Sequence, residues 1–424
     1  MAAPARKTGR TVVVALGGNA ILQPGQLGTF EEQLFNIDGA MRRIAALAAD
    51  GWRVVLTHGN GPQVGNLLIQ NALAAKTVAP MPMDVCGAMS QGQIGYLAAQ
   101  TLANHLAKRG VDAPVVTVVT QVAVDPADKA FENPTKPVGP FYTEGDARRM
   151  MLEEGVAMKE DAGRGWRRVV PSPEPREIVE LEAVRDLVEG GCLVVCSGGG
   201  GVPVVRSRGA LSGIDAVIDK DLAAALLARQ LGADALLILT DVPKAYIHYG
   251  TPEQEALDTV TASQMRAYAA AGHFKAGSMG PKVEACLRFV DAGGESVIAS
   301  LTEVKEALAG RAGTHIVPDD ASGAKRTRAG RSGGAQGKAG ASPKARVGGR
   351  KGGGEAGAGG GKSEAGGKTE VRGKTKAEDG KTGASGTADK APKRKAATQK
   401  PPRGARRRSG KTIDSSTRHS AVAE

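Results

Sequence analysis

The 424-residue sequence contains few cysteines and few aromatic residues. Its four cysteines form no CxxC pair, and Cys192 and Cys196 flank a short apolar run; the other two are Cys86 and Cys286. Paired CxxC motifs are typical of structural zinc sites and of redox-active thiols. We therefore expect no structural zinc, and we interpret the cysteines as small buried side chains in a reducing compartment.

Long hydrophobic runs are also missing. No stretch of 18 or more apolar residues occurs, which argues against a transmembrane helix. The first ten residues, MAAPARKTGR, lead into a strand-like run without the apolar core that a secretory signal needs. We expect a cytoplasmic protein that does not bind membranes.

Acidic residues become scarce near the C-terminal end. Residues 321–424 contain 26 Lys and Arg against 8 Asp and Glu, a net charge of +18, whereas residues 1–320 contain 30 against 36, a net charge of −6. All 13 aromatic residues lie before Ala321, and the segment after it has no leucine. Such a segment cannot bury enough apolar surface to offset the entropy of ordering it. We predict a folded domain over 1–318 and a disordered, Lys/Arg/Gly/Ala-rich tail over 319–424.

Within the folded domain, short apolar runs alternate with helical patterns. Apolar residues from Phe30 to Leu47 recur at spacings of three and four, which predicts one face of a helix. Further helices are predicted over 84–109 and 302–309, and strands over 11–16, 53–57, 115–119, 193–196, 235–240 and 297–299. This alternation indicates an α/β fold with a mainly parallel sheet, in which ligands bind beyond the carboxyl ends of the strands.

Residues 125–175 interrupt this alternation. They contain seven prolines, two phenylalanines, one tyrosine and one tryptophan. We predict an inserted subdomain that forms a lid over the site, and a long irregular surface loop is the alternative.

Three of the predicted strands end in glycine-rich loops. These loops are Gly17-Gly18-Asn19, His58-Gly59-Asn60-Gly61, and Ser197 followed by four glycines. Glycine lets backbone N–H groups approach a phosphate, and a helix N-terminus adds positive partial charge. A single Gly-Gly turn is weak evidence, but four consecutive glycines suggest a need for close backbone approach, such as a ligand. Neither a complete GxGxxG dinucleotide motif nor a GxxxxGK[ST] loop occurs in residues 1–318.

Several lysines lie close to these strand ends or to predicted helix starts. Lys220 lies between Asp219 and Asp221, with Asp215 just before them, and Asp221 is well placed to be an N-cap. Lys282 begins another predicted helix, and Lys136 lies among prolines 134, 137 and 140, which restrict its backbone. Each lysine alone fits an ordinary surface position. Their joint placement beside glycine-rich loops favours a phosphate site.

These motifs resemble those of the carbamate kinases, within the amino acid kinase family. The matching stretches are spread in order over residues 10–318: VVVALGGNAI (12–21), THGNGPQVGN (57–66), VDPAD (124–128), NPTKPVGPF (133–141), KEDAGRGWRRVVPSP (159–173), CSGGGG (196–201), AVIDKD (216–221), AGHF (271–274) and GSMGPK (277–282). The first, CSGGGG and AVIDKD resemble the wider family. The NPTKP and DAGRGW stretches resemble carbamate kinases specifically and favour that substrate.

The resemblance implies a three-layer αβα sandwich, a homodimer, a lid made by the insertion and a nucleotide-side lobe over about 214–318. It implies reversible phosphoryl transfer between ATP and carbamate, with Mg²⁺ arriving on the nucleotide, and a role in arginine catabolism where carbamoyl phosphate and ADP form ATP. Phosphoryl transfer is catalysed mainly by positioning and charge stabilisation, and the carbamate anion needs no catalytic base. Another small-acceptor enzyme of the same family is the alternative activity.

The resemblance also implies roles for single residues. Gly17, Gly18, Asn19, Gly59 and Asn60 would surround the transferred phosphoryl group, and Gly198 and Gly199 would line the same cleft. Lys136 would reach carbamoyl phosphate from the lid. Lys220 and Lys282 would hold the nucleotide phosphates, Asp221 would orient the lysines, and Asp241 would lie on the nucleotide side. No residue is assigned to the metal. One departure is Gly280, where a larger apolar residue is expected before Pro281.

Two interpretations of the basic tail stay open. Its basic clusters at 393–395 and 406–408 resemble linker-histone-like tails in composition, which predicts non-specific binding to nucleic acid or another polyanion. The chain would then be a nucleic-acid-associated protein, even one whose kinase body is only a scaffold. Alternatively the tail is a solvated appendage without a selected role, or the product of a wrongly extended reading frame.

The binding interpretation makes a testable prediction. A chain shortened to residues 1–320 should lose the DNA retention of the full chain in a gel shift. The full chain should bind without sequence preference, with dissociation constants on the order of 10⁻⁴–10⁻⁶ M that weaken steeply with salt. Equal retention of both chains would contradict this interpretation.

Overall fold

The computed structural model describes residues 9–161 and 165–320, which all fall within one unit of the chain, Met1–Ser332. The predicted tail beyond Asp320 lies outside the described residues. Asp319 belongs to the described part, where its carboxylate accepts hydrogen bonds from the backbone N–H and the hydroxyl of Ser263.

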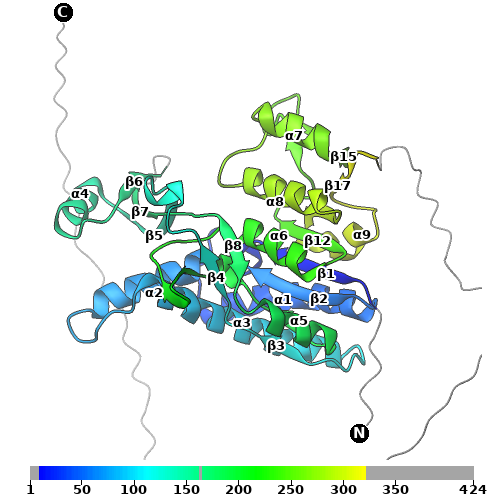
Figure 1. The fold of residues 1–424 in the computed structure, drawn as a ribbon, viewed down its shortest axis with the longest axis horizontal. Helices are drawn as coiled ribbons and strands as arrows, with labels where there is room; N and C mark the ends of the chain where they lie inside the picture. Colours follow the sequence, from blue (N-terminus) through cyan, green and yellow to red (C-terminus); the bar gives the residue numbers. More distant parts are fainter. Residues whose placement is uncertain (1–8, 162–164, 321–424) are drawn as a thin grey trace, which may run out of the picture. The chain divides into compact units, whose positions relative to one another are not determined.

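A central eight-stranded sheet organises this unit (Figure 1). Its spatial order is β15-β17-β16-β12-β1-β2-β9-β3, and all neighbours are parallel except β16 and β17. The strands are β1 (Thr11–Leu16), β2 (Arg53–His58), β3 (Val115–Thr117), β9 (Leu193–Val195), β12 (Ala235–Thr240), β15 (Thr259–Thr261), β16 (Glu295–Ser300) and β17 (Thr314–Val317). The predicted α/β class with a mainly parallel sheet is confirmed.

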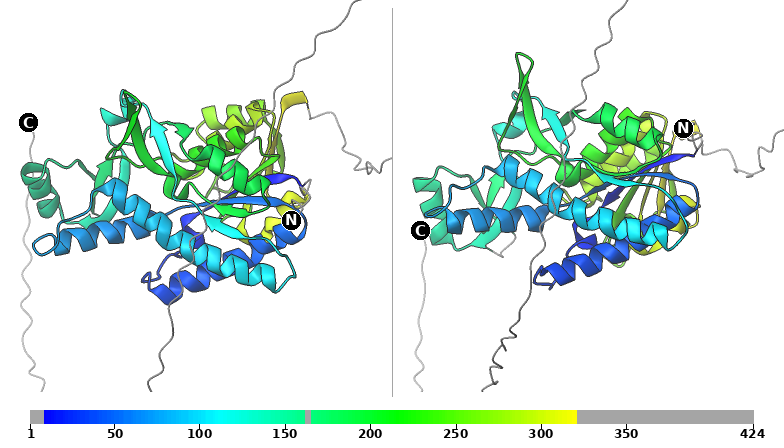
Figure 2. Two further views of the ribbon diagram at one scale, coloured as in Figure 1. Left: turned by 60° about the horizontal axis from the view of Figure 1, so that its bottom comes forward. Right: turned by 90° about the horizontal axis from the view of Figure 1, so that it is seen from below.

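Helices cover both faces of this sheet, as Figure 2 shows. On β1, Val13 and Ala15 pack into one buried cluster and Val12, Val14 and Leu16 into another, because side chains alternate across a strand. The first cluster includes α5 (Leu181–Glu189), α6 (Lys220–Leu231), α7 (Ala262–Ala270) and α8 (Met279–Asp291); the second includes α1 (Phe30–Ala49), α3 (Met83–Ala107) and α9 (Val304–Leu308). The arrangement is therefore a three-layer αβα sandwich.

The insertion at 125–175 contains regular structure, so the alternative of an irregular loop is wrong. Its three-stranded antiparallel sheet has the order β5-β7-β6, from β5 (Lys136–Tyr142), β6 (Met158–Glu160) and β7 (Trp166–Val170). Helix α4 (Glu144–Glu153) lies between β5 and β6 in the sequence and contacts β6 and β7. A small cluster of Met83, Val138 and Val170 packs this sheet against α2 (Gly61–Ala74) and the start of α3. Whether the sheet moves as a lid stays a prediction.

A four-stranded sheet lies next to the insertion in sequence. Its order is β11-β10-β4-β8, from β4 (Gln121–Val124), β8 (Pro175–Ile178), β10 (Val202–Ser207) and β11 (Ala210–Gly213). A short hairpin, β13 (Tyr246–Ile247) and β14 (Glu255–Ala256), follows the central strand β12.

Several element bounds differ from the prediction. The strand predicted over 115–119 ends at Thr117, and the helix predicted over 302–309 begins with a 3₁₀ turn at Leu301–Glu303. Helix α2 was not predicted, because its start at Gly61-Pro62 has the composition of a turn. Proline fits there because the first helical N–H groups need no partner within the helix.

The four cysteines are free thiols, and Cys86, Cys196 and Cys286 are buried. Burial raises the pKa of Cys196 and of Cys286 to about 12. None of the helices in the described ranges is long and apolar enough to cross a bilayer.

Candidate active site

The site is built where β1, β2, β9 and β12 reach their carboxyl ends at one edge of the sheet. The loops after β1 and β2 touch through their backbones, since Gly59 N donates to Leu16 O at 3.1 Å and a Cβ on Gly59 would lie 3.3 Å from Gly18 N. The loop after β1 also contacts β12, because Gly17 N donates to Leu239 O at 3.1 Å. Separate parts of the sequence therefore present main-chain groups side by side, as the parallel sheet predicts.

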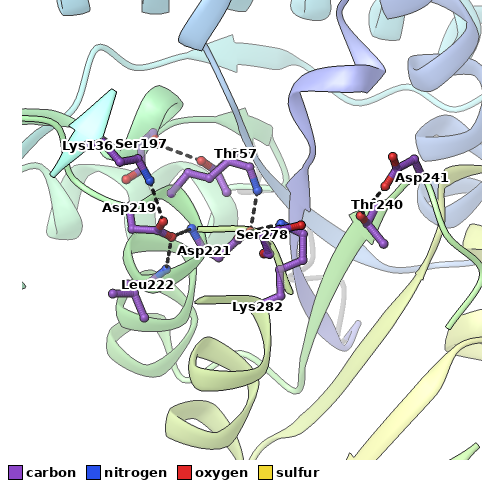
Figure 3. Close-up of polar contacts among 11 residues, drawn as sticks. Thr57, Lys136, Ser197, Asp219, Asp221, Leu222, Thr240, Asp241, Ser278 and Lys282 are labelled. Atoms are coloured by element: carbon purple, nitrogen blue, oxygen red, sulfur yellow. Dashed lines mark hydrogen bonds and ion pairs between the residues drawn. The ribbon is translucent and has the colours of Figure 1, made fainter. Parts of the chain in front are cut away.

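Lys220 and Lys282 share one buried carboxylate at this edge. Lys220 is the first residue of α6, and its Nζ lies 2.5 Å from Asp221 Oδ1. Lys282, in the first turns of α8, places its Nζ 3.0 Å from Asp221 Oδ2 (Figure 3). The Asp221 side chain is only 4% exposed. Two ammonium groups from different helices thus converge on one anion.

The charges of this triad depend on each other. Burial alone would raise the pKa of Asp221, but the positive charges of Lys220 and Lys282 outweigh burial and lower it. Burial lowers the pKa of Lys220, and the Asp221 charge offsets part of that change. With Asp221 ionised and both lysines protonated, the triad carries one net positive charge toward any anion bound there.

Lys136 reaches the same region from the three-stranded sheet. It is the first residue of β5, and its Nζ lies 2.9 Å from Asp219 Oδ2. Asp219, not Asp221, is the N-cap of α6: its Oδ1 accepts from Asp221 N at 2.9 Å and Leu222 N at 3.4 Å. The N-cap prediction for Asp221 was therefore wrong, because Asp221 is the second residue of the helix and its carboxylate contacts Lys220 and Lys282.

A hollow of about 570 Å³ opens beside these groups. Of the predicted site residues, six line it: Gly17, Gly18, Asn19, Lys220, Asp241 and Lys282. A second hollow of about 350 Å³ shares Thr240, Asp241, Ser278 and Lys282 with the first. Asp241 is held at the junction by hydrogen bonds from Asn19 Nδ2 at 3.2 Å and Thr240 Oγ1 at 3.0 Å.

The second hollow has an aromatic and histidine wall that the sequence analysis missed. Its lining includes Tyr246, His248, Tyr249, His273 and Phe274. The His248 and His273 rings stack edge to face with centroids 4.5 Å apart. No sequence spacing connects the β13 region with the loop after α7, so only the tertiary fold brings these rings together.

The run of four glycines is explained by packing. A Cβ on Gly198 would lie 2.4 Å from His58 Nε2, and one on Gly199 would lie 2.2 Å from Asn60 Nδ2. Gly200 and Gly201 have φ of +94° and +89° and face Ile218 and Val122 equally closely. Neighbouring side chains and backbone therefore exclude every Cβ here. A ligand-binding role for Gly198 and Gly199 stays a prediction, since neither residue lines the hollows described above.

Gly280 does not prevent Lys282 from reaching Asp221. Gly280 N donates to Lys275 O at 3.0 Å, and a Cβ on Gly280 would lie 3.1 Å from that oxygen. A larger residue would crowd this contact. The departure from the expected apolar residue therefore matches the tight local backbone.

His58 is a buried residue of the site that the sequence analysis did not single out. Burial lowers its pKa to about 4; a hydrogen bond to Gly59 acts against this and the charge of Lys220 adds to it. Its Nδ1 lies 2.9 Å from Gly59 O, so the neutral ring donates from Nδ1 to that carbonyl. His58 thus fixes the loop after β2 without adding charge.

The comparisons with known proteins agree with this geometry. The sequence profile of the amino acid kinase family matches residues 10–300. The carbamate kinase of Pyrococcus furiosus is 53% identical over 313 residues, which are 73% of this chain and 100% of the relative. The carbamate kinase of Thermococcus kodakarensis is 55% identical over 312 residues, which are 73% of this chain and 99% of the relative.

Solved structures agree as well. The carbamate kinase of Giardia lamblia bound to AMP-PNP superposes with a TM-score of 0.71 at 49% identity, covering 74% of this chain and 100% of that one. The chain belongs to the amino acid kinase family, and within it to the carbamate kinases.

The low pKa of His58 makes a prediction about stability and pH. An unfolded histidine has its usual pKa near 6.5, so between pH 6.5 and about 4 the unfolded chain binds a proton that the folded chain does not. Stability should therefore fall as the pH decreases through this range. The fall should be steeper in the wild type than in His58→Asn by up to about 1.4 kcal/mol per pH unit.

Denaturant unfolding of both proteins at pH 7, 6 and 5 measures this difference. His248→Asn, at an exposed histidine, controls for the substitution itself. Parallel pH profiles for wild type and His58→Asn would show that the His58 ring titrates normally in the fold.

Proposed function

We propose that this chain catalyses reversible phosphoryl transfer between ATP and carbamate, with ADP and carbamoyl phosphate as the products. The observation that carries the proposal is the convergence of Lys220 and Lys282 on buried Asp221, at the rim of the sheet beside the Gly17-Gly18 loop. The membership of the chain among the carbamate kinases supports the substrate.

The two hollows suggest where the reactants lie. The 570 Å³ hollow combines backbone groups of Gly17 and Gly18 with two lysines, which suits phosphates. The 350 Å³ hollow offers aromatic rings and suits the adenine base, with Asp241 between them. A nucleotide analogue bound to the Giardia lamblia relative supports nucleotide binding here.

In phosphoryl transfer the protein contributes mainly positioning of the reactants and stabilisation of charge. The phosphoryl group carries its negative charge on three equatorial oxygens during transfer, so fixed positive groups stabilise that state. Lys220 and Lys282 supply the charge from one side, and we place Lys136 on the acceptor side. Mg²⁺ bound to the nucleotide would add further positive charge on the phosphates, and no side chain is assigned to hold it. Carbamate is already an anion, so no side chain has to remove a proton from it.

The loops complete the site. We place Asn19, Gly59 and Asn60 around the transferred phosphoryl group, and Gly198 and Gly199 on the same side. The Asn60 side chain is oriented by donation from Nδ2 to Ser90 Oγ at 2.8 Å. We further propose that the β5-β7-β6 sheet acts as the lid of this domain and that residues 214–318 form its nucleotide lobe.

The cellular location and the pathway are proposed from the resemblance to the carbamate kinases alone. We place the reaction in the cytoplasm, in arginine catabolism, where it would run toward ATP. Another small-acceptor enzyme of the amino acid kinase family is the competing activity, and the substrate assay below separates the two.

The activity prediction uses purified protein. It should form ATP from ADP and carbamoyl phosphate with Mg²⁺. Acetyl phosphate should not replace carbamoyl phosphate as the phosphoryl donor, and N-acetylglutamate should not replace carbamate as the acceptor in the reverse reaction from ATP. Lys220→Ala and Lys136→Ala should each lower turnover by roughly 10²–10³, because each removes a charge that stabilises the transition state. Lys108→Ala, at an exposed site on the far end of α3, is the control. A folded Lys220→Ala enzyme with full turnover would remove that lysine from the mechanism.

We also propose that the chain forms a homodimer through α1 and α3. Both helices carry exposed apolar side chains, among them Phe30, Phe35, Met89 and Tyr96, with Phe35 77% exposed. Exposed apolar patches of this kind are typical of protein interfaces.

Sedimentation should give twice the mass of one chain. Phe35→Asp should shift the protein toward monomers, whereas Leu152→Asp on α4, where the side chain is 86% exposed, should leave the dimer intact. A wild-type protein that sediments as a monomer at micromolar concentration would contradict this assignment.

A further inference from the structure

Asp219 uses its two carboxylate oxygens for different partners. Oδ1 accepts the hydrogen bonds that cap α6, from Asp221 N at 2.9 Å and Leu222 N at 3.4 Å. Oδ2 lies 2.9 Å from Lys136 Nζ, on a strand 83 residues earlier in the sequence (Figure 3). The Asp219 side chain is 14% exposed. One side chain thus joins the inserted sheet to the helix that begins with Lys220 and Asp221.

The capping role does not explain the charge of Asp219. Asparagine and serine cap helices about as well as aspartate and carry no charge. A carboxylate beside a site for anionic phosphates also repels the substrate by Coulomb's law. The negative charge therefore needs another reason, and among the described residues its cationic partner at hydrogen-bond distance is Lys136.

An acidic partner would restrict the position of the Lys136 ammonium group. Its backbone is restrained in β5 beside Pro137, but a lysine side chain has four rotatable bonds and is one-third exposed here. A group that stabilises a transition state works best when its position is fixed before the reaction. Asp219 supplies that fixed point, and because it also caps α6, the position of Lys136 is tied to the helix that holds Lys220.

We propose that Asp219 is a positioning residue that holds Lys136 at the phosphoryl site and so couples the inserted sheet to the start of α6. This inference rests on the proposed phosphoryl transfer. It adds a residue that acts through Lys136 and does not itself touch the reactants.

The same two regions provide a matched control. Arg168 of β7 and Asp215 form a second ion pair between the inserted sheet and the segment before α6, with Nη2 and Oδ2 2.5 Å apart. Asp215 is 56% exposed and contacts no lysine of the site. Asp215→Asn therefore removes a link between the same regions without changing the partner of Lys136.

The test is a double-mutant cycle in the direction of ATP formation. Turnover and KM for carbamoyl phosphate are measured for wild type, Asp219→Asn, Lys136→Met, the double variant and Asp215→Asn. Wild-type activity is established first, because its absence would refute the proposed function and not this inference. Asp219→Asn keeps the cap, so its melting temperature should stay within a few degrees of wild type.

We expect Asp219→Asn to lower turnover at least tenfold in the presence of Lys136 and less than twofold in the Lys136→Met background. Asp215→Asn should change turnover less than twofold. Equal losses in both backgrounds would assign Asp219 an effect independent of Lys136 and overturn the proposal, as would wild-type turnover in Asp219→Asn.

A second substitution that also keeps a helix-capping side chain at position 219 distinguishes a loss of positioning from a loss of folding. Asp219→Ser should repeat the Lys136-dependent loss if Asp219→Asn proves unstable. Loss of the fold in both variants would assign the carboxylate to folding alone, and the positioning role would be rejected.

Discussion

Two ammonium groups repel each other, and they can lie together in a partly buried site only if an anion between them is buried as well. Asp221 supplies that anion for Lys220 and Lys282, at 2.5 and 3.0 Å. Removing Asp221 would leave two largely buried ammonium groups without a counter-charge, which is far more costly than losing a surface ion pair. The triad links the start of α6 to the start of α8, and its Lys282 lines both hollows.

The parallel sheet brings the triad to the right place. Loops from β1, β2, β9 and β12 meet at one edge because parallel strands end together. A Cβ would lie only 3.1 Å from Leu239 O at Gly17 and 3.3 Å from Gly18 N at Gly59, so main-chain groups approach closely beside the lysines. The inserted sheet then adds Lys136 from a distant part of the sequence. Charge from side chains and dipoles from backbone are thereby combined at one point.

Much of this could be predicted from the sequence, because buried strands are continuous apolar runs and their ends mark the site. The gathering of lysines was expected from their placement beside glycine-rich loops and from the resemblance to carbamate kinases. What could not be predicted depends on orientation. Asp219 and Asp221 lie two residues apart and both have side chains that can cap a helix. Only the residue at which α6 begins decides which of them is the N-cap. Helix α2 starts with turn-like residues, and the His248–His273 pair arises from two separate loops.

The glycine run after β9 shows how packing and chemistry can make the same demand on a sequence. His58, Asn60, Ile218 and Val122 each occupy the space that a methyl group at one of these four glycines would need. Selection for folding alone would preserve the run, even in a descendant that had lost its catalytic activity. A retained glycine run therefore does not indicate that a protein is still an active enzyme. Retained lysines are the better indicator of activity.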